Sequence, residues 1–372
     1  MRKRRRRDGI VEEPTQRVSG YRPGWRIRSC ALLAALAACL EIHAFRSALA
    51  DEPGSTNEPP ATYFRIGTAA ANEDVFPVGG MIADAISFRP GGQGCDSGGC
   101  GVSGLIAVAQ ATQGSLENAE AIEDGKLESG IIQADIAYWR YTGQWIYAAR
   151  KPAGQLRVIA NLFTESIQLV ARRDSGIRSV SDLKGKRVAV GEPDSGTHVD
   201  ADIVLGGFGL TEKNLVARHL PVIAAAELLR QGKLDAFFLV SGTPAASIAK
   251  LAETTAGSAS AITLVPIDGK GAERIRNAYP FYFETVVPGD TYRGIEPTKT
   301  LGLFAQWVTS ERLDSGLIYE ITRALWNKSA RALLDSGAPE GREINLEHAL
   351  DGLRLPIHEG AARFYREAGI LK

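Results

Sequence analysis

Short apolar runs typical of β-strands alternate along this chain with segments typical of helices. The runs at 105–110 and 131–135 are each followed by a helical pattern, and the same order recurs at 236–240. Strands that alternate with helices form a mostly parallel sheet with helices on its faces. The sequence therefore predicts an α/β fold. At 372 residues the chain is too long for one hydrophobic core, so two lobes are expected.

Small polar residues gather where the predicted strands end and the helices begin. Ligands of open α/β sheets bind outside the carboxyl ends of the strands, close to helix N-termini. The candidate ligand site therefore lies at four junctions, which are 67–68, 112–115, 191–197 and 241–244.

The sharpest of these junctions is EPDSGT at 192–197. Ser195 and Thr197 can cap a helix by accepting bonds from backbone N–H groups, and Gly196 lets another group approach the backbone. The free N–H groups and the helix dipole at such a position also bind carboxylates and phosphates. A plain cap and an anion site are both open on the residues alone. A Walker phosphate loop is excluded because no Gly-Lys-Ser/Thr follows at the required spacing.

Two further segments carry polar residues that have either a structural role or a role in contacting the ligand. The sequence SLEN at 115–118 fits a capping box begun by Ser115, but an inward-facing Asn118 would hydrogen-bond a ligand. Gln133 and Asp135 alternate out of an apolar strand and are expected on one face of it, in a structural or a ligand-contacting role.

Catalytic and metal-binding constellations are weak. The sequence has no H-E-x-x-H motif and no G-x-S-x-G elbow. His198 has no second metal ligand at helical spacing, so it is interpreted as a satisfied or solvent-facing histidine. No catalytic residue, metal site or cofactor is expected, and the chain is not expected to be an enzyme.

The first 50 residues have the three parts of a secretory signal peptide. A basic region at 2–7 precedes the apolar run CALLAALAACL at 30–40, and Ala48-Leu49-Ala50 provides an A-x-A cleavage site. The apolar run is too short to span a bilayer. Cleavage after Ala50 predicts a periplasmic protein with a flexible N-terminus at 51–61. Lipidation of Cys39 is the less favoured alternative.

The charge of the chain is unevenly distributed. The first 50 residues contain 11 of the 43 Lys and Arg and 4 of the 43 Asp and Glu, which leaves 32 basic and 39 acidic residues, a net charge of −7. Binding to nucleic acid requires a basic face that neutralises phosphates. The acidic body therefore excludes nucleic acid as the expected partner.

Cys95 and Cys100 lie in the glycine-rich segment PGGQGCDSGGCGVSG. In an exported protein, two cysteines this close predict a local disulfide that stiffens one loop. A metal site or a catalytic thiol is disfavoured because no histidine lies near them in the sequence.

The order of several motifs resembles the TAXI family, the TRAP-associated extracytoplasmic immunogenic solute receptors. The resemblance covers nearly all of residues 62–372. It is carried by FRIGT at 64–68 with PVGG at 77–80, TQGSLEN at 112–118, GIIQADIAY at 130–138, DLKGKRVAVG at 182–191 with SGT at 195–197, YPFY at 279–282, and IHEGAARFYREAG at 357–369.

This resemblance implies a type II periplasmic-binding-protein fold, in which two α/β lobes joined by a hinge enclose a ligand. Residues 62–162 with 288–372 would form lobe 1 and residues 163–287 lobe 2. Family members of known ligand tend to bind glutamate or related dicarboxylates and deliver them to a sodium-coupled TRAP membrane subunit. The matching positions imply ligand contacts for Thr68, Ser115, Asn118, Gln133, Ser195, Gly196 and Thr197, and for Glu165 either a ligand ammonium or a hinge role.

One loop departs from the family pattern. After Gly67-Thr68 the family usually continues with Gly and Thr residues, whereas this chain has AAANEDVF. Glu73 and Asp74 would disfavour an anionic ligand if they faced the cleft, and Asn72 becomes a substitute ligand contact. The expected function is a periplasmic receptor for a small metabolite, with glutamate or a related carboxylate favoured. The alternative is a periplasmic sensor or co-receptor for a signalling kinase.

Overall fold

A computed structural model describes residues 61–71, 73–87, 101–253 and 261–372 of the chain. The predicted signal peptide with Cys39, the segment 51–60, Asn72 and the cysteine pair Cys95 and Cys100 lie outside these residues, so the expectations for them stay predictions. Within the described ranges, no helix combines the length and the apolar character that crossing a membrane requires.

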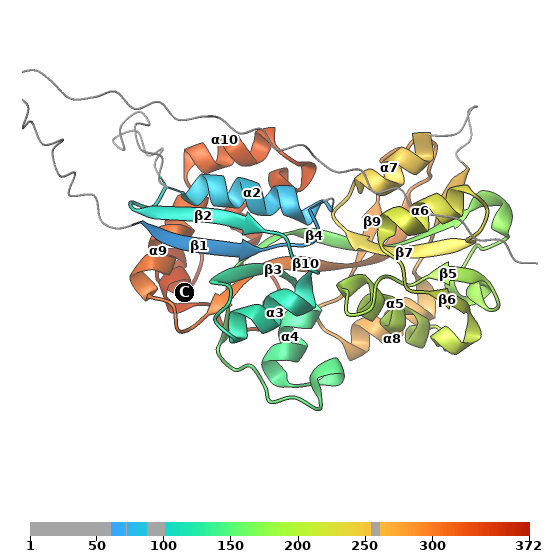
Figure 1. Cartoon of the computed structure of the whole chain (residues 1–372), viewed down its shortest axis with the longest axis horizontal. Coiled ribbons are helices and arrows are strands. Elements are labelled where there is room, and N and C mark those ends of the chain that lie inside the picture. Colours follow the sequence, from blue (N-terminus) through green and yellow to red (C-terminus); the bar gives the residue numbers. More distant parts are fainter. Residues whose placement is uncertain (1–60, 72, 88–100, 254–260) are drawn as a thin grey trace, which may run out of the picture. The chain divides into compact units, whose positions relative to one another are not determined.

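Three parallel strands form the first half of the sheet (Figure 1). β1 (Thr62–Gly67) lies between β2 (Leu105–Gln110) and β3 (Ser129–Gln133) and pairs in parallel with both. The helices that pack with these strands and with one another are α2 (Val75–Ile86), α3 (Ser115–Glu123), α4 (Ala134–Thr142), α9 (Ser315–Leu325), α10 (Lys328–Ser336) and α11 (Glu359–Glu367).

The second half repeats this arrangement with the parallel strands β7 (Ala236–Ser241), β5 (Arg187–Ala189) and β6 (Val216–Arg218), in that spatial order. Two short strands, β8 (Ile262–Val265) and β9 (Phe283–Val287), pair antiparallel with the strands between the halves. The helices of this half are α5 (Gly196–Gly207), α6 (Val222–Arg230), α7 (Ala246–Glu253) and α8 (Gly269–Ala278).

Two long antiparallel strands, β4 (Leu156–Arg172) and β10 (Thr298–Ser310), belong to both halves (Figure 1). Beyond their mutual pairing, β10 pairs with β3 on the side of the first half, and β4 pairs with β7 on the side of the second. The largest hydrophobic cluster also joins the halves, because it contains Ile132 and Trp139 together with Leu205 and Ile275. The α/β class predicted from the alternation is therefore confirmed, while the lobe boundaries at 162/163 and 287/288 stay predictions.

Two local predictions were wrong. The apolar runs at 156–162 and 167–171, which the sequence pattern predicts as two separate strands, form one continuous strand, because the residues between them keep pairing with β10. Asp135 is not in a strand, because β3 ends at Gln133 and α4 begins at Ala134 without an intervening loop. Gln133 and Asp135 therefore do not alternate along one strand face.

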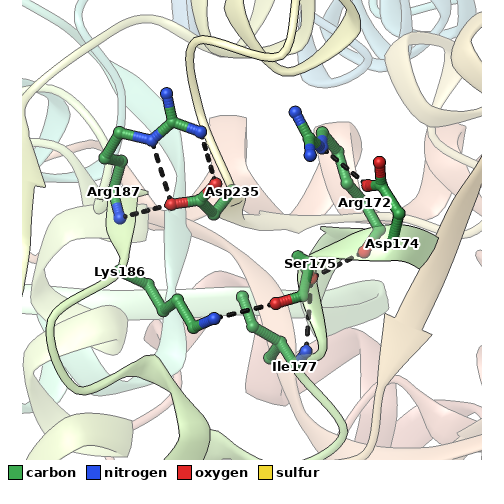
Figure 2. A network of polar contacts seen from close by, with 7 residues as sticks. All are labelled: Arg172, Asp174, Ser175, Ile177, Lys186, Arg187 and Asp235. Carbon is green, nitrogen blue, oxygen red and sulfur yellow. Dashed lines mark hydrogen bonds and ion pairs between the residues drawn. The ribbon is translucent and has the colours of Figure 1, made fainter.

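A polar network holds the amino ends of β5 and β7 and the carboxyl end of β4 (Figure 2). Arg187 at the start of β5 pairs with Asp235 just before β7, with Nε–Oδ2 and Nη2–Oδ1 distances of 3.0 and 2.5 Å. Lys186 donates to the carbonyl oxygen of Ser175 at 2.8 Å. A two-point Arg–carboxylate pair fixes orientation as well as distance. This network lies at the opposite strand ends from the predicted ligand site, and its role is structural.

The C-terminal helix offers a test of how the fold is held together. Tyr365 on α11 is fully buried; its hydroxyl donates to the carbonyl of Ile159 at 3.0 Å and accepts from the indole of Trp326 at 3.2 Å. Tyr365→Phe leaves both partners unpaired in the core, so we expect the free energy of unfolding to fall by about 1–3 kcal/mol in urea denaturation. Tyr63→Phe, at a tyrosine that is 65% exposed, should change it by less than about 0.5 kcal/mol. Equal effects would show that the buried hydroxyl contributes nothing.

Candidate functional site

A cavity lies at the carboxyl ends of β1, β3, β5 and β7, where the strand-end rule places ligands. Its volume of about 80 Å³ exceeds several times the roughly 10–15 Å³ that one water molecule requires. It is lined from the first half by Thr68, Ala69, Glu73, Val75, Gln113, Gly114, Ser115, Ile131 and Gln133, from β4 by Glu165, and from the second half by Gly191, Glu192, Ser195, Gly196, Thr197, Leu220, Pro221, Val222, Phe238, Leu239 and Val240.

Most of the residues predicted as ligand contacts meet at this cavity. Asn118 does not line it: its amide donates to the carbonyls of Thr68 and Ile131 at 2.7 and 2.9 Å, and its side chain fills the space beside Gly67 and Gly130. The structure therefore gives Asn118 a role in joining β1, β3 and α3. The predicted contacts that do line the cavity are Thr68, Ser115, Gln133, Glu165, Ser195, Gly196 and Thr197.

The first turn of α5 forms one wall of the cavity. Ser195 is its N-cap: the hydroxyl accepts from the N–H of His198 at 3.2 Å and donates to the carbonyl of Glu192 at 2.8 Å. The Thr197 hydroxyl accepts from the N–H of Val240 at 3.2 Å. The side chains thus serve the protein itself. The backbone N–H groups of Gly196 and Thr197 have no acceptor among the described residues and are the donors that can hold an anion.

Neighbouring atoms approach the backbone of Gly191 and Gly196 so closely that neither position has room for a side chain. Gly191 has a φ of 98°, and a Cβ there would lie 2.8 Å from the N–H nitrogen of His198. A Cβ on Gly196 would lie only 1.4 Å from Oε1 of Gln133, which reaches across from β3. The close packing of Gln133 on Gly196 is a direct contact between the two halves, and sequence reasoning did not pair them.

Buried carboxyl groups dominate the electrostatics of the site. Glu165 on β4 is 4% exposed, and its Oε2 atom has no hydrogen-bond partner among the residues that the structure describes. Burial, then the charge of Asp135, raise its pKa to about 8, although a hydrogen bond from Gln133 acts in the opposite direction. Burial, then the charges of Glu192 and Asp74, raise the pKa of Glu73 to about 7. Glu73 therefore faces the cavity, which the sequence left as a question.

Behind the cavity wall, a tyrosine joins two aspartates from the two halves. Tyr282 places its hydroxyl 2.5 Å from Oδ1 of Asp200 on α5 and 3.2 Å from Oδ2 of Asp135 on α4. Asp200 also accepts from the Gln133 amide at 3.2 Å. Burial raises the pKa of Asp135 to about 7, and burial followed by the Asp135 charge raises that of Asp200 well above its usual range. The Tyr282 hydroxyl therefore links α4 with α5 through these two carboxyl groups.

Sequence reasoning missed several lining residues. Glu192 lies inside the predicted junction 191–197 but is not among the predicted contacts, and the end of β7 at 238–240 lines the cavity instead of the predicted turn at 241–244. Leu220 and Pro221 carry no polar signal and lie after a three-residue strand. Applying the strand-end rule a few residues earlier along β7 would have found 238–240.

The contact between Gln133 and Gly196 predicts the effect of a single methyl group. In Gly196→Ala the Gln133 side chain must leave its place and lose its hydrogen bond to Asp200, so the free energy of unfolding should fall by about 1–3 kcal/mol. Gly206→Ala, on the same helix with nothing within 4 Å of its added Cβ, is the matched control and should not destabilise the chain. Denaturation in urea compares them, and indistinguishable stabilities would contradict the proposed contact between the halves.

The carboxyl groups also predict a pH dependence. Since the pKa values of Glu73, Asp135 and Glu165 are raised in the folded chain, the folded state binds more protons than the unfolded state between pH about 4 and about 8. The free energy of unfolding should therefore fall as pH rises through this window. Asp135→Asn should flatten the slope measured between pH 5 and 8. Glu227→Gln should not, because the pKa of this exposed residue is lowered to about 2 by its hydrogen bond with Arg230. A slope unaffected by Asp135→Asn would refute the assignment.

Comparison with known proteins gives one family match and a set of structural likenesses. The chain is similar to the periplasmic aliphatic sulphonate binding protein SsuA from Escherichia coli, with 13% identity, a TM-score of 0.38 and coverage of 74% of this chain and 78% of that chain. The alkanesulfonate-binding protein SsuA from Xanthomonas axonopodis pv. citri bound to MOPS is 14% identical, with a TM-score of 0.42 and coverage of 84% of this chain and 96% of that chain. PhnD1 from Prochlorococcus marinus in complex with methylphosphonate is 12% identical, with a TM-score of 0.45 and coverage of 83% of this chain and 99% of that chain. At these identities and TM-scores, the likenesses support no statement about the function of this chain. The model of the NMT1-like family matches residues 66–369, and the chain therefore belongs to the NMT1-like family.

Proposed function

We propose that this chain is an exported solute receptor, not an enzyme, that encloses a small zwitterionic amino acid between its two halves. The observation that carries this proposal is Glu165, a carboxyl group that lines the cavity and is 4% exposed. One of its oxygens has no partner within the described part of the chain. A buried polar group without a partner is costly, so its presence points to a ligand group that completes it.

The start of α5 favours a ligand group of the opposite charge to the one that Glu165 favours. The N–H groups of Gly196 and Thr197 and the positive end of the helix dipole favour a carboxylate. Both ends of the site contact Gln133, which hydrogen-bonds Glu165 and packs on Gly196. An ammonium at Glu165 and a carboxylate at α5 are therefore within reach of one small molecule. That pairing is the defining feature of an α-amino acid.

The remaining lining decides which amino acids fit. No Lys, Arg or His side chain lines the cavity among the described residues, whereas Glu73 and Glu192 do. A second carboxylate on the ligand would meet like charges without a cationic partner. We therefore propose that the ligand is an amino acid with a small uncharged side chain. Glutamate, the ligand that the TAXI resemblance implies, is the less favoured candidate.

The cellular role follows from the same resemblance. We propose that the receptor works in the periplasm and delivers its ligand to a TRAP membrane subunit. Closure of the two halves on the ligand is then a shift of population toward the state in which both halves contact it. Ligand uptake by cells that carry the TRAP membrane subunits should require this chain. A role as co-receptor for a signalling kinase would instead leave uptake unchanged while abolishing the transcriptional response.

The ligand class is tested by dissecting alanine into its two charged ends. Isothermal titration with alanine, serine, glycine and glutamate, and with ethylamine and propionate as the two fragments of alanine, should show binding of the small amino acids and at least about tenfold weaker binding of each fragment, because each loses one charged contact. Propionate binding as tightly as alanine would contradict the role of Glu165. Absence of binding by all amino acids would contradict the proposed ligand class.

The charge of the bound group has a separate signature in pH. An ammonium stabilises ionised Glu165, so binding releases a proton and the affinity should rise as pH increases from about 6 to about 8. Glu165→Gln should weaken binding by about tenfold or more and remove this proton release, which titrations in buffers of different ionisation enthalpy measure. Glu273→Gln, at an exposed position on α8, is the control. Affinity that rises toward acid pH would indicate an anionic ligand.

A further inference from the structure

We propose that the second half carries a site for a divalent transition-metal ion of the zinc class, formed by His198, Glu212 and His219. The three side chains come from three elements: His198 lies in the first turn of α5, Glu212 begins the short 3-10 helix η5 (Glu212–Asn214), and His219 directly follows β6. Their ligand atoms all lie within 4.8 Å of one another.

The geometry is close to what a tetrahedral ion requires. Nε2 of His198 lies 2.7 Å from Oε1 of Glu212, and Nε2 of His219 lies 3.2 Å from the same oxygen. Ligands at about 2.0–2.1 Å from a zinc ion are about 3.3 Å from each other in a tetrahedron. A shift of less than about 1 Å in the His198–Glu212 pair would therefore admit the ion between the three groups.

The donor set selects the class of ion. Two imidazole nitrogens and one carboxylate suit zinc, copper and nickel, whereas calcium and magnesium favour oxygen ligands. Burial alone would raise the pKa of Glu212, but hydrogen bonds from His198 and His219 outweigh it and the pKa is lowered.

A fourth carboxylate stands next to the cluster. Asp202 follows His198 by four residues on α5 and therefore lies on the same helix face, so the expectation that His198 has no second ligand at helical spacing was wrong. Its charge interacts with Glu212 and with both histidines. Asp202 is not among the ligand atoms within 4.8 Å of one another, so its role in the proposed site is to hold a metal-bound water.

The site adjoins one wall of the ligand cavity without being part of it. His198 directly follows Thr197, and His219 directly precedes Leu220, both of which line the cavity. A bound ion would tie the first turn of α5 to the segment before α6. The sequence could not show this pairing, because 20 positions separate the histidines and only the β5–α5–β6 crossover brings them together.

The experiment is a titration of the metal-free full chain with Zn²⁺ alone. Calorimetry measures the binding, and the melting temperature of the chain is measured with and without the ion. We expect binding of one ion per chain at this cluster and a rise in melting temperature. His219→Gln and Glu212→Gln should each weaken that binding by more than about tenfold, since loss of a direct ligand costs at least as much as loss of an outer partner.

The control is His348→Gln. His348 is also a surface histidine paired with a carboxylate, Asp351, at 2.7 Å, but it has no second histidine beside it. Its substitution should leave Zn²⁺ binding unchanged, and circular dichroism shows whether each variant folds. Absence of Zn²⁺ binding, or binding that survives both Glu212→Gln and His219→Gln, would overturn the proposal and reduce the cluster to a hydrogen-bonded surface triad.

Discussion

The pairing of β4 with β10 is the constraint on which the rest of the site depends. Because both strands pass from one half of the sheet to the other, the loops at the strand ends of both halves are directed to the same place. Glu165 lies near the middle of β4 and opposite Leu303, one pair from the end of the β4–β10 pairing. Its position is therefore set by two strands rather than by a loop, and the ligand groups must be arranged around it. A site built on strands is held more tightly than one built on loops.

The buried carboxyl groups explain why such a receptor needs its ligand. Asp135, Asp200 and Glu165 are all buried, and no Lys, Arg or His among the described residues forms an ion pair with them. When empty, the closed arrangement must keep protons on these groups, because ionised carboxylates in a low-dielectric site are strongly destabilised. Under the proposed function, an ammonium group of the ligand supplies the missing charge. Such a ligand would favour the closed state by neutralisation as well as by contact, which is the differential affinity that closure requires.

The sequence predicted the α/β class, and three of the four junctions that it predicted line the cavity, because both follow from local rules. Strand–helix alternation gives the parallel sheets, and small polar residues at strand ends mark the junctions that line the cavity. The features that the sequence did not predict depend on contacts between segments that are far apart in the chain. The packing of Gln133 on Gly196 joins positions 63 residues apart, and the Tyr282 link joins three elements. The continuity of β4 was missed because the polar residues at 164–166 interrupt an apolar pattern, although their backbone groups continue to pair with β10.

The same framework can serve different ligands when only the rim of the site changes. The N–H groups at the start of α5 depend on backbone geometry and on the cap at Ser195, so they recognise a carboxylate whatever else the ligand carries. Glu73 and Glu192 are side chains on loops, and their charges decide what the distal end of the ligand can be. In the TAXI pattern, the segment that contains Glu73 is neutral. Acidic residues at that position repel an anionic side chain at the distal end of a ligand. Under the proposed function, this chain therefore binds the amino-acid frame and excludes the dicarboxylates.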